Sequence, residues 1–258
     1  MDEIACFFFV GVDPENGISK SKVLSNDIVE LAISDTYDDL PQKVLGFFRW
    51  ALENSDFEWL FKCDDDTYLD LERLGELPIT NVDLIGDESL EQRGAPSGGA
   101  GYLLSRRAVE ALCKDEQLAL TGPEDLIIGH AIAGYGMPTH STQRLCLHSQ
   151  RHPRRDNNMI SAHWCDPDRM RMIFAIRYDE TIRQIEATHP FWQDSLFLFP
   201  DGTFVRKSSS CSGRWQESSN GHIHLDWSGW NPEELIPADP SPSPHDQRNY
   251  RCVPAPTK

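Results

Sequence analysis

The sequence lacks an excess of positive charge and lacks long apolar runs, and each absence excludes a class of protein. It contains 24 lysines and arginines against 41 aspartates and glutamates, which gives a formal net charge of -17. This charge argues against non-specific binding to nucleic acid or to an anionic membrane. No apolar run approaches the roughly 18 residues of a membrane-spanning helix. The apolar stretch 5–12 is short and follows two acidic residues, which is unlike a signal peptide.

A Cys-x-x-Cys pair is also absent. The seven cysteines are an odd number and lie far apart in the sequence. This spacing indicates neither a zinc knuckle nor a disulfide framework, so a reducing compartment is the simpler expectation. We therefore expect a cytoplasmic protein, as in a bacterial cytosol, or one of the Golgi lumen if the chain is a truncated form.

The 258 residues are enough for one large domain with a small appendage. The apolar patterns predict strands at 6–12, 28–33, 58–62 and 83–86, and helices at 40–54, 107–113 and 124–133. Their alternation predicts an α/β fold with a mostly parallel central sheet at 1–175. Beyond it, 181–187 reads as the end of a helix, and a hairpin is expected around the turn at 200–202. We expect a small antiparallel β-rich domain at 176–236 and a flexible tail at 237–258.

Three consecutive aspartates, residues 64–66, follow an apolar stretch that reads as a buried strand. Adjacent carboxylates repel one another, so a folded protein keeps three together with a compensating cation or with full solvation. The carboxyl end of a central strand is where open α/β sheets bind ligands. Such oxygen ligands suit Mg²⁺ or Mn²⁺, which are usually shared with substrate phosphates. A solvated acidic loop is the alternative, but the aromatic strand before the motif favours the metal.

Two further motifs contain candidate functional residues, and each has a structural alternative. Gly98 and Gly99 lie in a glycine-rich loop whose backbone N–H groups can approach a ligand closely, although a plain loop is favoured on sequence alone. Glu124 and Asp125 begin a predicted helix, where acids favour the helix dipole and Thr121 can act as the cap. A carboxylate there can also act as a general base toward a substrate hydroxyl, but the capping role is favoured.

His163 follows a predicted strand and can supply a nitrogen ligand beside the aspartate oxygens. A lone histidine is more often structural, and His148 and His152 compete for the same role. The three arginines between 151 and 155 form a basic cluster that can meet phosphate or remain a solvated loop.

Taken in order, these motifs resemble the inverting β-1,3-glycosyltransferases of the galactosyltransferase and Fringe type, glycosyltransferase family 31. The resemblance covers roughly residues 5–173, and five motifs in order make it specific. The motifs are residues 7–11 (FFFVG), 61–68 (FKCDDDTY), 97–105 (SGGAGYLLS), 124–129 (EDLIIG) and 163–170 (HWCDPDRM). The resemblance implies a GT-A-like nucleotide-sugar transferase fold, a UDP-sugar donor, a glycan or glycoconjugate acceptor, and a role such as polysaccharide biosynthesis.

The resemblance also implies how the donor is bound. Asp66 and His163 would ligate Mn²⁺, or Mg²⁺ in its place, and the metal would offset the charge on the departing UDP. Asp64 would lie near the ribose, and Asp65 would support the turn.

On the acceptor side, the resemblance makes Asp125 the catalytic base that deprotonates the acceptor hydroxyl, with inversion at the anomeric carbon. Gly98 and Gly99 would line the cleft between donor and acceptor. Tyr102 and Trp164 are candidates to stack on sugar faces, but core packing is favoured for both. The sugar moved would be galactose or an N-acetylhexosamine, in a β-1,3 linkage.

Two features depart from the family pattern. The sequence begins near the family's second strand, so we expect both the first β-α unit of the nucleotide site and the N-terminal membrane span of anchored members to be missing. Residues 190–236 match nothing in that family. A catalytically degenerate transferase fold that binds carbohydrate or acts as a scaffold is therefore the main alternative, and a metal-dependent phosphohydrolase is another.

Overall fold

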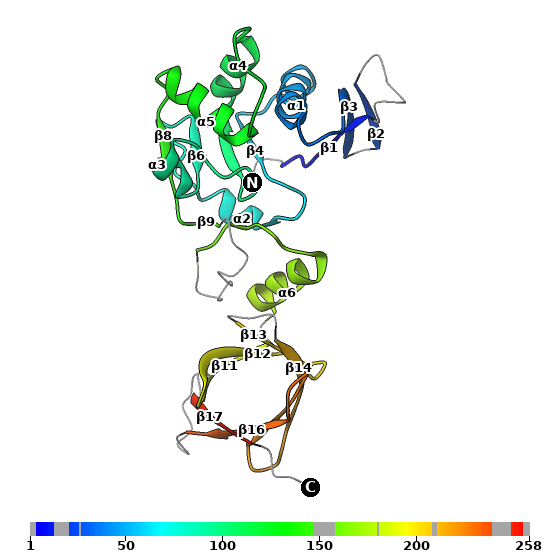
Figure 1. Ribbon diagram of the computed structural model, residues 1–258, viewed down its shortest axis with the longest axis vertical. Helices are drawn as coiled ribbons and strands as arrows, with labels where there is room; N and C mark the ends of the chain where they lie inside the picture. The colour runs from blue at the N-terminus through cyan, green and yellow to red at the C-terminus, as the bar shows by residue number, and fades with distance from the viewer. Residues whose placement is uncertain are drawn as a thin grey trace. The chain divides into compact units, whose positions relative to one another are not determined.

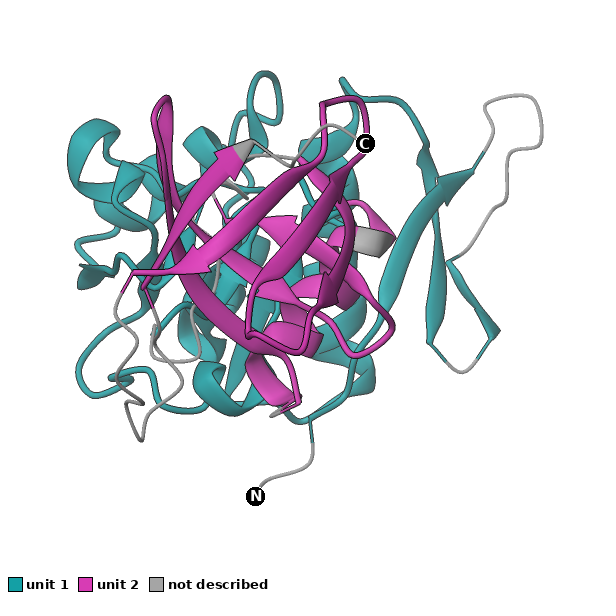
Figure 2. Cartoon of the chain, turned by 90° about the horizontal axis from the view of Figure 1, so that it is seen from below, with its two compact units in different colours: residues 1–148, 158–165 teal, residues 149–157, 166–258 magenta. Residues whose placement is uncertain are grey.

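The computed structural model describes residues 4–12, 21–25, 27–146, 158–179, 181–207, 211–238 and 249–254 (Figure 1). The chain divides into two compact units (Figure 2). The first contains residues 1–148 and 158–165, and the second contains 149–157 and 166–258. His148, His152 and the arginines between 151 and 155 lie outside the described residues.

The first unit alternates strands with helices. Its elements are β1 (Phe8–Val12), β2 (Lys22–Ser25), β3 (Ile28–Ser34), α1 (Leu40–Asn54), β4 (Trp59–Lys62), β5 (Tyr68–Leu69), α2 (Leu71–Leu74), β6 (Leu84–Gly86), α3 (Ser89–Arg93), β7 (Tyr102–Ser105), α4 (Arg106–Lys114), α5 (Glu124–Gly134), β8 (Thr139–Ser141), β9 (Leu145–Cys146) and β10 (Ser161–Ala162).

The described strands of this unit form three mixed sheets, ordered β1-β3-β2, β4-β7-β6-β8 and β5-β10-β9. In the four-stranded sheet, β7 runs antiparallel to both β4 and β6, whereas β6 and β8 are parallel. The α/β class is confirmed, but the mostly parallel central sheet is not. Alternation suggested crossover helices within one sheet, yet α1 joins β3 to β4, which belong to different sheets. The glycine-rich loop then returns the chain into β7 alongside β6.

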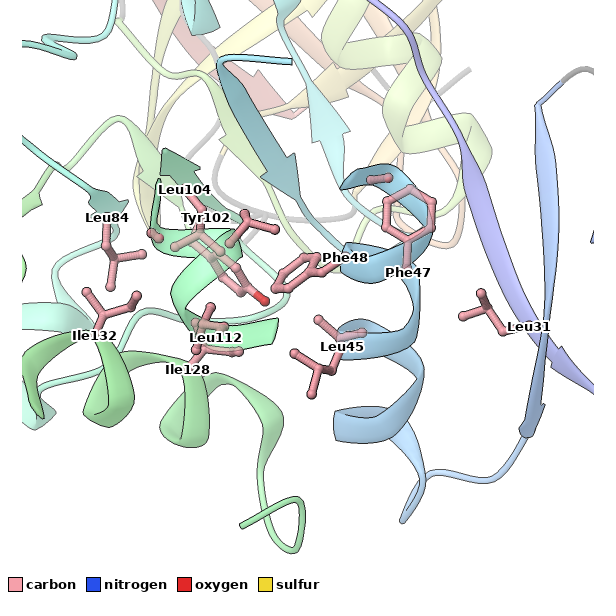
Figure 3. Close-up of a cluster of buried hydrophobic side chains, with 14 of the residues drawn as sticks. Leu31, Leu45, Phe47, Phe48, Leu84, Tyr102, Leu104, Leu112, Ile128 and Ile132 are labelled. Carbon is pink, nitrogen blue, oxygen red and sulfur yellow. The ribbon is translucent and has the colours of Figure 1, made fainter. Parts of the chain in front are cut away.

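Helix α1 occupies its predicted range because Pro41 stands in its first turn and apolar residues recur on one side. Leu45 and Phe48 of this helix join Tyr102 of β7 and Leu112 of α4 in one buried cluster (Figure 3). Burying each large apolar side chain stabilises the fold by about 1.5–3 kcal/mol. This core holds β7, and with it the end of the glycine-rich loop, in a fixed position.

The second unit is a helix followed by strands. Its elements are α6 (Pro167–Tyr178), β11 (Arg183–His189), β12 (Trp192–Leu198), β13 (Thr203–Arg206), β14 (Ser212–Glu217), β15 (Ile223–Trp227), β16 (Glu233–Pro237) and β17 (Asn249–Pro254). The strands form a closed barrel, because β17 pairs with both β16 and β11. The hairpin predicted around the turn at 200–202 is present as β12 and β13.

Two predictions for this unit are wrong. The helix expected to end within 181–187 ends at Tyr178, and β11 takes its place because alternate residues Ile185 and Ala187 enter the barrel core. The flexible tail expected at 237–258 contains β17, whose Tyr250 and Cys252 are buried in that core. Two apolar positions in a polar, proline-rich stretch were too weak a signal to predict a strand.

Candidate functional site

The aspartate motif lies where strand β4 ends and the chain turns toward β5. Strand β4 pairs along its whole length with β7, so the aspartate motif begins at the end of a strand whose position is fixed. The backbone N–H of Thr67 donates to the carbonyl of Asp64 at 3.2 Å, which forms a turn around the three carboxylates. Asp64 and Asp66 are half-buried, whereas Asp65 is exposed and points its charge toward solvent.

His163 joins two of these aspartates. One ligand atom each from Asp64, Asp66 and His163 lies within 4.8 Å of the other two. His163 Nε2 is 3.1 Å from Asp66 Oδ1 and 3.7 Å from Asp64 Oδ2. The histidine is held by its backbone N–H, which donates to the carbonyl of Cys146 at 3.0 Å. Its neighbour Cys165 donates its backbone N–H to the carbonyl of Asp66, so the two segments are directly connected.

The donor set of this cluster fits a divalent cation. Asp66 Oδ1 is buried and, despite its closeness to His163, has no hydrogen-bond partner within the described part of the chain. A buried carboxylate oxygen without a partner is costly unless a cation binds it. Two carboxylates and one imidazole suit Mn²⁺, which accepts oxygen and nitrogen ligands together, and Mg²⁺ less well.

The glycine-rich loop packs directly against this cluster. A Cβ atom on Gly99 would lie 2.2–2.4 Å from the ring atoms of His163, so only glycine fits there. The carbonyl of Gly99 accepts from Thr67 Oγ1 at 2.7 Å, and that of Ala100 accepts from Ser161 Oγ at 2.5 Å. The loop is therefore tied both to the aspartate turn and to β10, and close packing requires glycine at position 99.

A buried lysine links the three motifs. Lys62 Nζ lies 2.7 Å from Asp64 Oδ1, 3.3 Å from the carbonyl of Gly98 and 3.5 Å from Glu124 Oε2. Burial disfavours the charged amine, but Glu124 and Asp64 outweigh it and raise the pKa of Lys62. Burial disfavours the charged form of Glu124 as well, and so raises the pKa of this carboxyl. Lys62 and the Tyr102 hydroxyl, which donates to Glu124, favour the carboxylate but do not outweigh burial.

Glu124 and Asp125 begin α5 but have different surroundings. Glu124 is buried, whereas the Asp125 side chain is 18% exposed. Asp125 Oδ2 accepts from Arg93 Nη2 at 2.7 Å and from the backbone N–H of Gly98 at 3.2 Å. The capping role expected for Thr121 is wrong, because Pro123 holds the cap position and makes no side-chain cap. Both acids lie against Gly98, but Asp125 is the member of the pair that is partly exposed and accepts the backbone N–H of the glycine loop.

Part of this chain is similar to known proteins. Residues 1–92, which include the aspartate motif, match the family model described as galactosyltransferase. UDP-GalNAc:beta-1,3-N-acetylgalactosaminyltransferase 2 of Mus musculus is 28% identical over 146 residues. The resemblance to the β-1,3-glycosyltransferases of this type is confirmed. The protein of the same name from Xenopus laevis is 31% identical over 144 residues, and that from Homo sapiens is 42% identical over 55 residues.

The galactosyltransferase-type region is only part of what these relatives contain. The mouse and Xenopus laevis alignments cover 48% and 46% of this chain, but 29% and 30% of the relatives. The chain therefore spans less than a third of the length of these curated relatives. In the part of the chain that the structure describes, no helix is long and apolar enough to cross a membrane.

The structure brings together all the predicted donor-side residues except Asp65. It also adds two that the sequence did not single out, Lys62 and Arg93. Lys62 could have been found from the sequence, because a lysine at the end of an apolar strand needs an acidic partner when it is buried. Arg93 follows no pattern, because its partner Asp125 is distant in sequence. Tyr102 is fully buried and cannot stack on a sugar.

Proposed function

We propose that this chain is a metal-dependent inverting glycosyltransferase, which moves a hexose from a UDP-sugar to a hydroxyl of a glycan acceptor through a β-1,3 linkage. The observation that carries the proposal is the cluster of Asp64, Asp66 and His163 beside the glycine-rich loop, in which a buried Asp66 oxygen lies 3.1 Å from His163 Nε2 but has no hydrogen-bond partner among the described residues. The printed names of the relatives support N-acetylgalactosamine as the first donor sugar to test, with galactose as the second.

Asp66 and His163 are the proposed metal ligands, with Asp64 beside them. Mn²⁺ bound there would act as a Lewis acid and stabilise negative charge on the departing diphosphate. Asp64 binds Lys62 through Oδ1, so its other oxygen is the one directed at the metal or the ribose. Asp65, being exposed, is left with a supporting role in the turn.

Asp125 is the proposed general base. Its carboxylate is next to Gly98 and partly exposed, so an acceptor hydroxyl can reach it. In the present arrangement Arg93 pairs with the same oxygen, so the acceptor hydroxyl must displace Arg93 or approach beside it. Proton transfer to Asp125 would then accompany attack on the anomeric carbon, from the face opposite UDP.

The same contacts support one alternative, a binding module without catalysis. Both oxygens of Asp125 are engaged, Oδ2 by Arg93 and Gly98, and Oδ1 by the backbone N–H of Leu126. A carboxylate held this way is suited to fixing the loop onto α5 rather than to accepting a proton.

Substituting Asp125 separates the two functions. Asp125→Asn keeps the size and the acceptor oxygen, so fold and UDP binding should remain. If Asp125 is the base, transfer of N-acetylgalactosamine or galactose from the UDP-sugar should fall by roughly 10²–10⁴-fold. Sugar transfer with Mn²⁺, measured beside the thermal unfolding midpoint, is the test.

Glu124→Gln provides the comparison. Because Glu124 is buried against Lys62 and Tyr102, this change should lower thermal stability, by about 1–3 kcal/mol, through the lost ionic partner. Unchanged transfer in Asp125→Asn would reject Asp125 as the base. Absence of transfer in the unmodified chain with both donors, together with metal-dependent UDP binding, would favour the binding module.

A further inference from the structure

The second unit carries a group of aromatic and polar side chains at one end of its barrel. Hairpins β11–β12 and β15–β16 both turn at this end, as their antiparallel registers require. We call this group the barrel mouth; it consists of His189, Phe191, Trp192, Trp227, Trp230 and Glu233.

Side chains tie the two hairpins together across the barrel. Strands β11 and β16 are not neighbours in the sheet order, yet His189 Nε2 lies 3.3 Å from Glu233 Oε1. The rings of Trp192 and Trp227 meet edge to face with centroids 6.0 Å apart. The mouth is therefore one continuous surface rather than two separate loops.

The inner rings of the mouth are held rigidly. The His189 ring stacks on Trp192 with centroids 5.3 Å apart, and the Arg206 guanidinium lies 4.5 Å from the centre of the same indole ring. Trp227 Nε1 donates to Glu233 Oε2 at 3.1 Å. With Trp227 buried and the Trp192 ring covered by His189 and Arg206, these inner rings form a rigid support for the exposed rings of the mouth.

Two further rings of the mouth are exposed. Phe191 is 91% exposed and Trp230 is 71% exposed, each in one of the two hairpin turns. The Phe191 ring lies 5.3 Å from His189, so it extends the inner aromatic group outward. Exposed rings contribute little to barrel stability through burial, and two of them in turns at the same end of the barrel indicate a binding surface.

A metal is a poor occupant, although His189, Glu233 and Cys252 place ligand atoms within 4.8 Å of one another. His189 Nδ1 accepts the backbone N–H of Phe191 at 3.1 Å, so the proton of the neutral ring stands on Nε2, which faces Glu233. Cys252 Sγ donates to Glu233 at 2.9 Å, and burial, with Glu233 beside it, raises the pKa of that thiol. These groups form a hydrogen-bonded floor beneath the mouth.

We propose that the barrel mouth is a binding site for an uncharged saccharide. A sugar ring offers a C–H face that stacks on indole or phenyl rings, and a rim of hydroxyls that bonds to polar groups. The one cation that touches these rings is already paired, since Arg206 Nε lies 3.1 Å from Asp194 Oδ2, and Glu233 is held by hydrogen bonds from Trp227 and Cys252. The described mouth thus has no cation left over for phosphate or nucleic acid. The site does not depend on sugar transfer by the first unit.

The test is saccharide binding to the full chain by saturation-transfer NMR and calorimetry, in EDTA so that metal-dependent donor binding is suppressed. The probes are lactose, N,N′-diacetylchitobiose and a β-1,3-linked N-acetylgalactosamine disaccharide. At least one should bind saturably, and Phe191→Ala or Trp230→Ala should weaken that binding about tenfold. Tyr37→Ala removes a ring that is 85% exposed in the first unit and should change nothing.

Because Phe191 and Trp230 are exposed, their substitution should leave the thermal unfolding midpoint unchanged. An unchanged midpoint shows that any loss of saccharide binding comes from the missing ring and not from unfolding. Failure of all three probes to bind at millimolar concentration would overturn the proposal. Binding that survives both substitutions would overturn it as well. A change of oligomeric state in either variant, without loss of saccharide binding, would assign the mouth to contacts between protein chains instead.

Discussion

At the scale of single residues, the site depends on close packing at Gly99 and on the buried ion pairs of Lys62. Gly99 leaves room for the His163 ring, and Lys62 holds Asp64, Glu124 and the Gly98 carbonyl around one buried amine. Removing Lys62 would leave Glu124 buried without its cationic partner, the kind of change that is strongly destabilising in protein interiors. Substitutions of Gly99 or Lys62 should therefore lower metal affinity or stability even where they do not touch the substrate.

Gly99→Ala tests whether His163 belongs to a metal centre. The new Cβ would collide with the imidazole ring, so His163 must shift from its present position beside Asp66. We expect Mn²⁺ affinity to fall by roughly 10–100-fold, the usual effect of disturbing the support of a ligand. Calorimetry with Mn²⁺ alone measures this without any transfer activity.

Gly134→Ala is the matched control, because a Cβ at that position meets nothing within 4 Å. It should leave Mn²⁺ binding unchanged and raise stability slightly, by up to about 1 kcal/mol, as alanine favours the helix. A Gly99→Ala protein with full Mn²⁺ affinity would show that His163 is not a ligand.

At the scale of elements, ion pairs fasten helix starts onto strands. Asp83 at the edge of β6 accepts from Ser105 Oγ at 2.5 Å and from Arg107 Nε at 3.1 Å at the start of α4. Burial alone would raise the pKa of Asp83, but Arg107 and Ser105 outweigh it and lower the pKa below its usual value. The folded state thus favours the charged form of Asp83 and connects β6 to α4.

The lowered pKa of Asp83 predicts a pH dependence of stability. The stabilisation is present above the unfolded-state pKa of about 3.9 and is lost as pH falls through the lower folded-state value. Asp83→Asn should cost about 1–3 kcal/mol near pH 7 and less at about pH 3. Urea unfolding of both proteins at the two pH values measures the difference. An equal cost at both would mean that the carboxylate charge contributes nothing.

Element positions were largely predictable from sequence, but strand pairing was not. Helix α1 and strand β4 follow from a proline in the first turn and from short apolar runs. The antiparallel place of β7 between β4 and β6 depends on long-range pairing that no local pattern records. The same holds for the site, since Asp64, Asp66 and His163 were predicted by motif, whereas the pair of Arg93 with Asp125 depends on tertiary packing.

At the scale of the whole molecule, the net charge determines whether a nucleotide can bind to the first unit without a cation. A protein of net charge -17 repels an anionic nucleotide unless a local cation offsets that charge. Lys62 is already paired with Asp64 and Glu124, and Arg93 with Asp125. Among the described residues of the site, the cations are thus committed to carboxylates, and the metal proposed for Asp66 and His163 would be the remaining source of positive charge.

Titration of UDP into the full chain, once with Mn²⁺ and once with EDTA, tests this central claim most directly. We predict saturable binding with Mn²⁺, at least tenfold weaker or absent binding in EDTA, and the same loss in Asp66→Ala with Mn²⁺ present. The exposed neighbour provides the control, since Asp65→Ala should retain metal-dependent binding. Equal UDP affinity in Mn²⁺ and in EDTA would contradict the account.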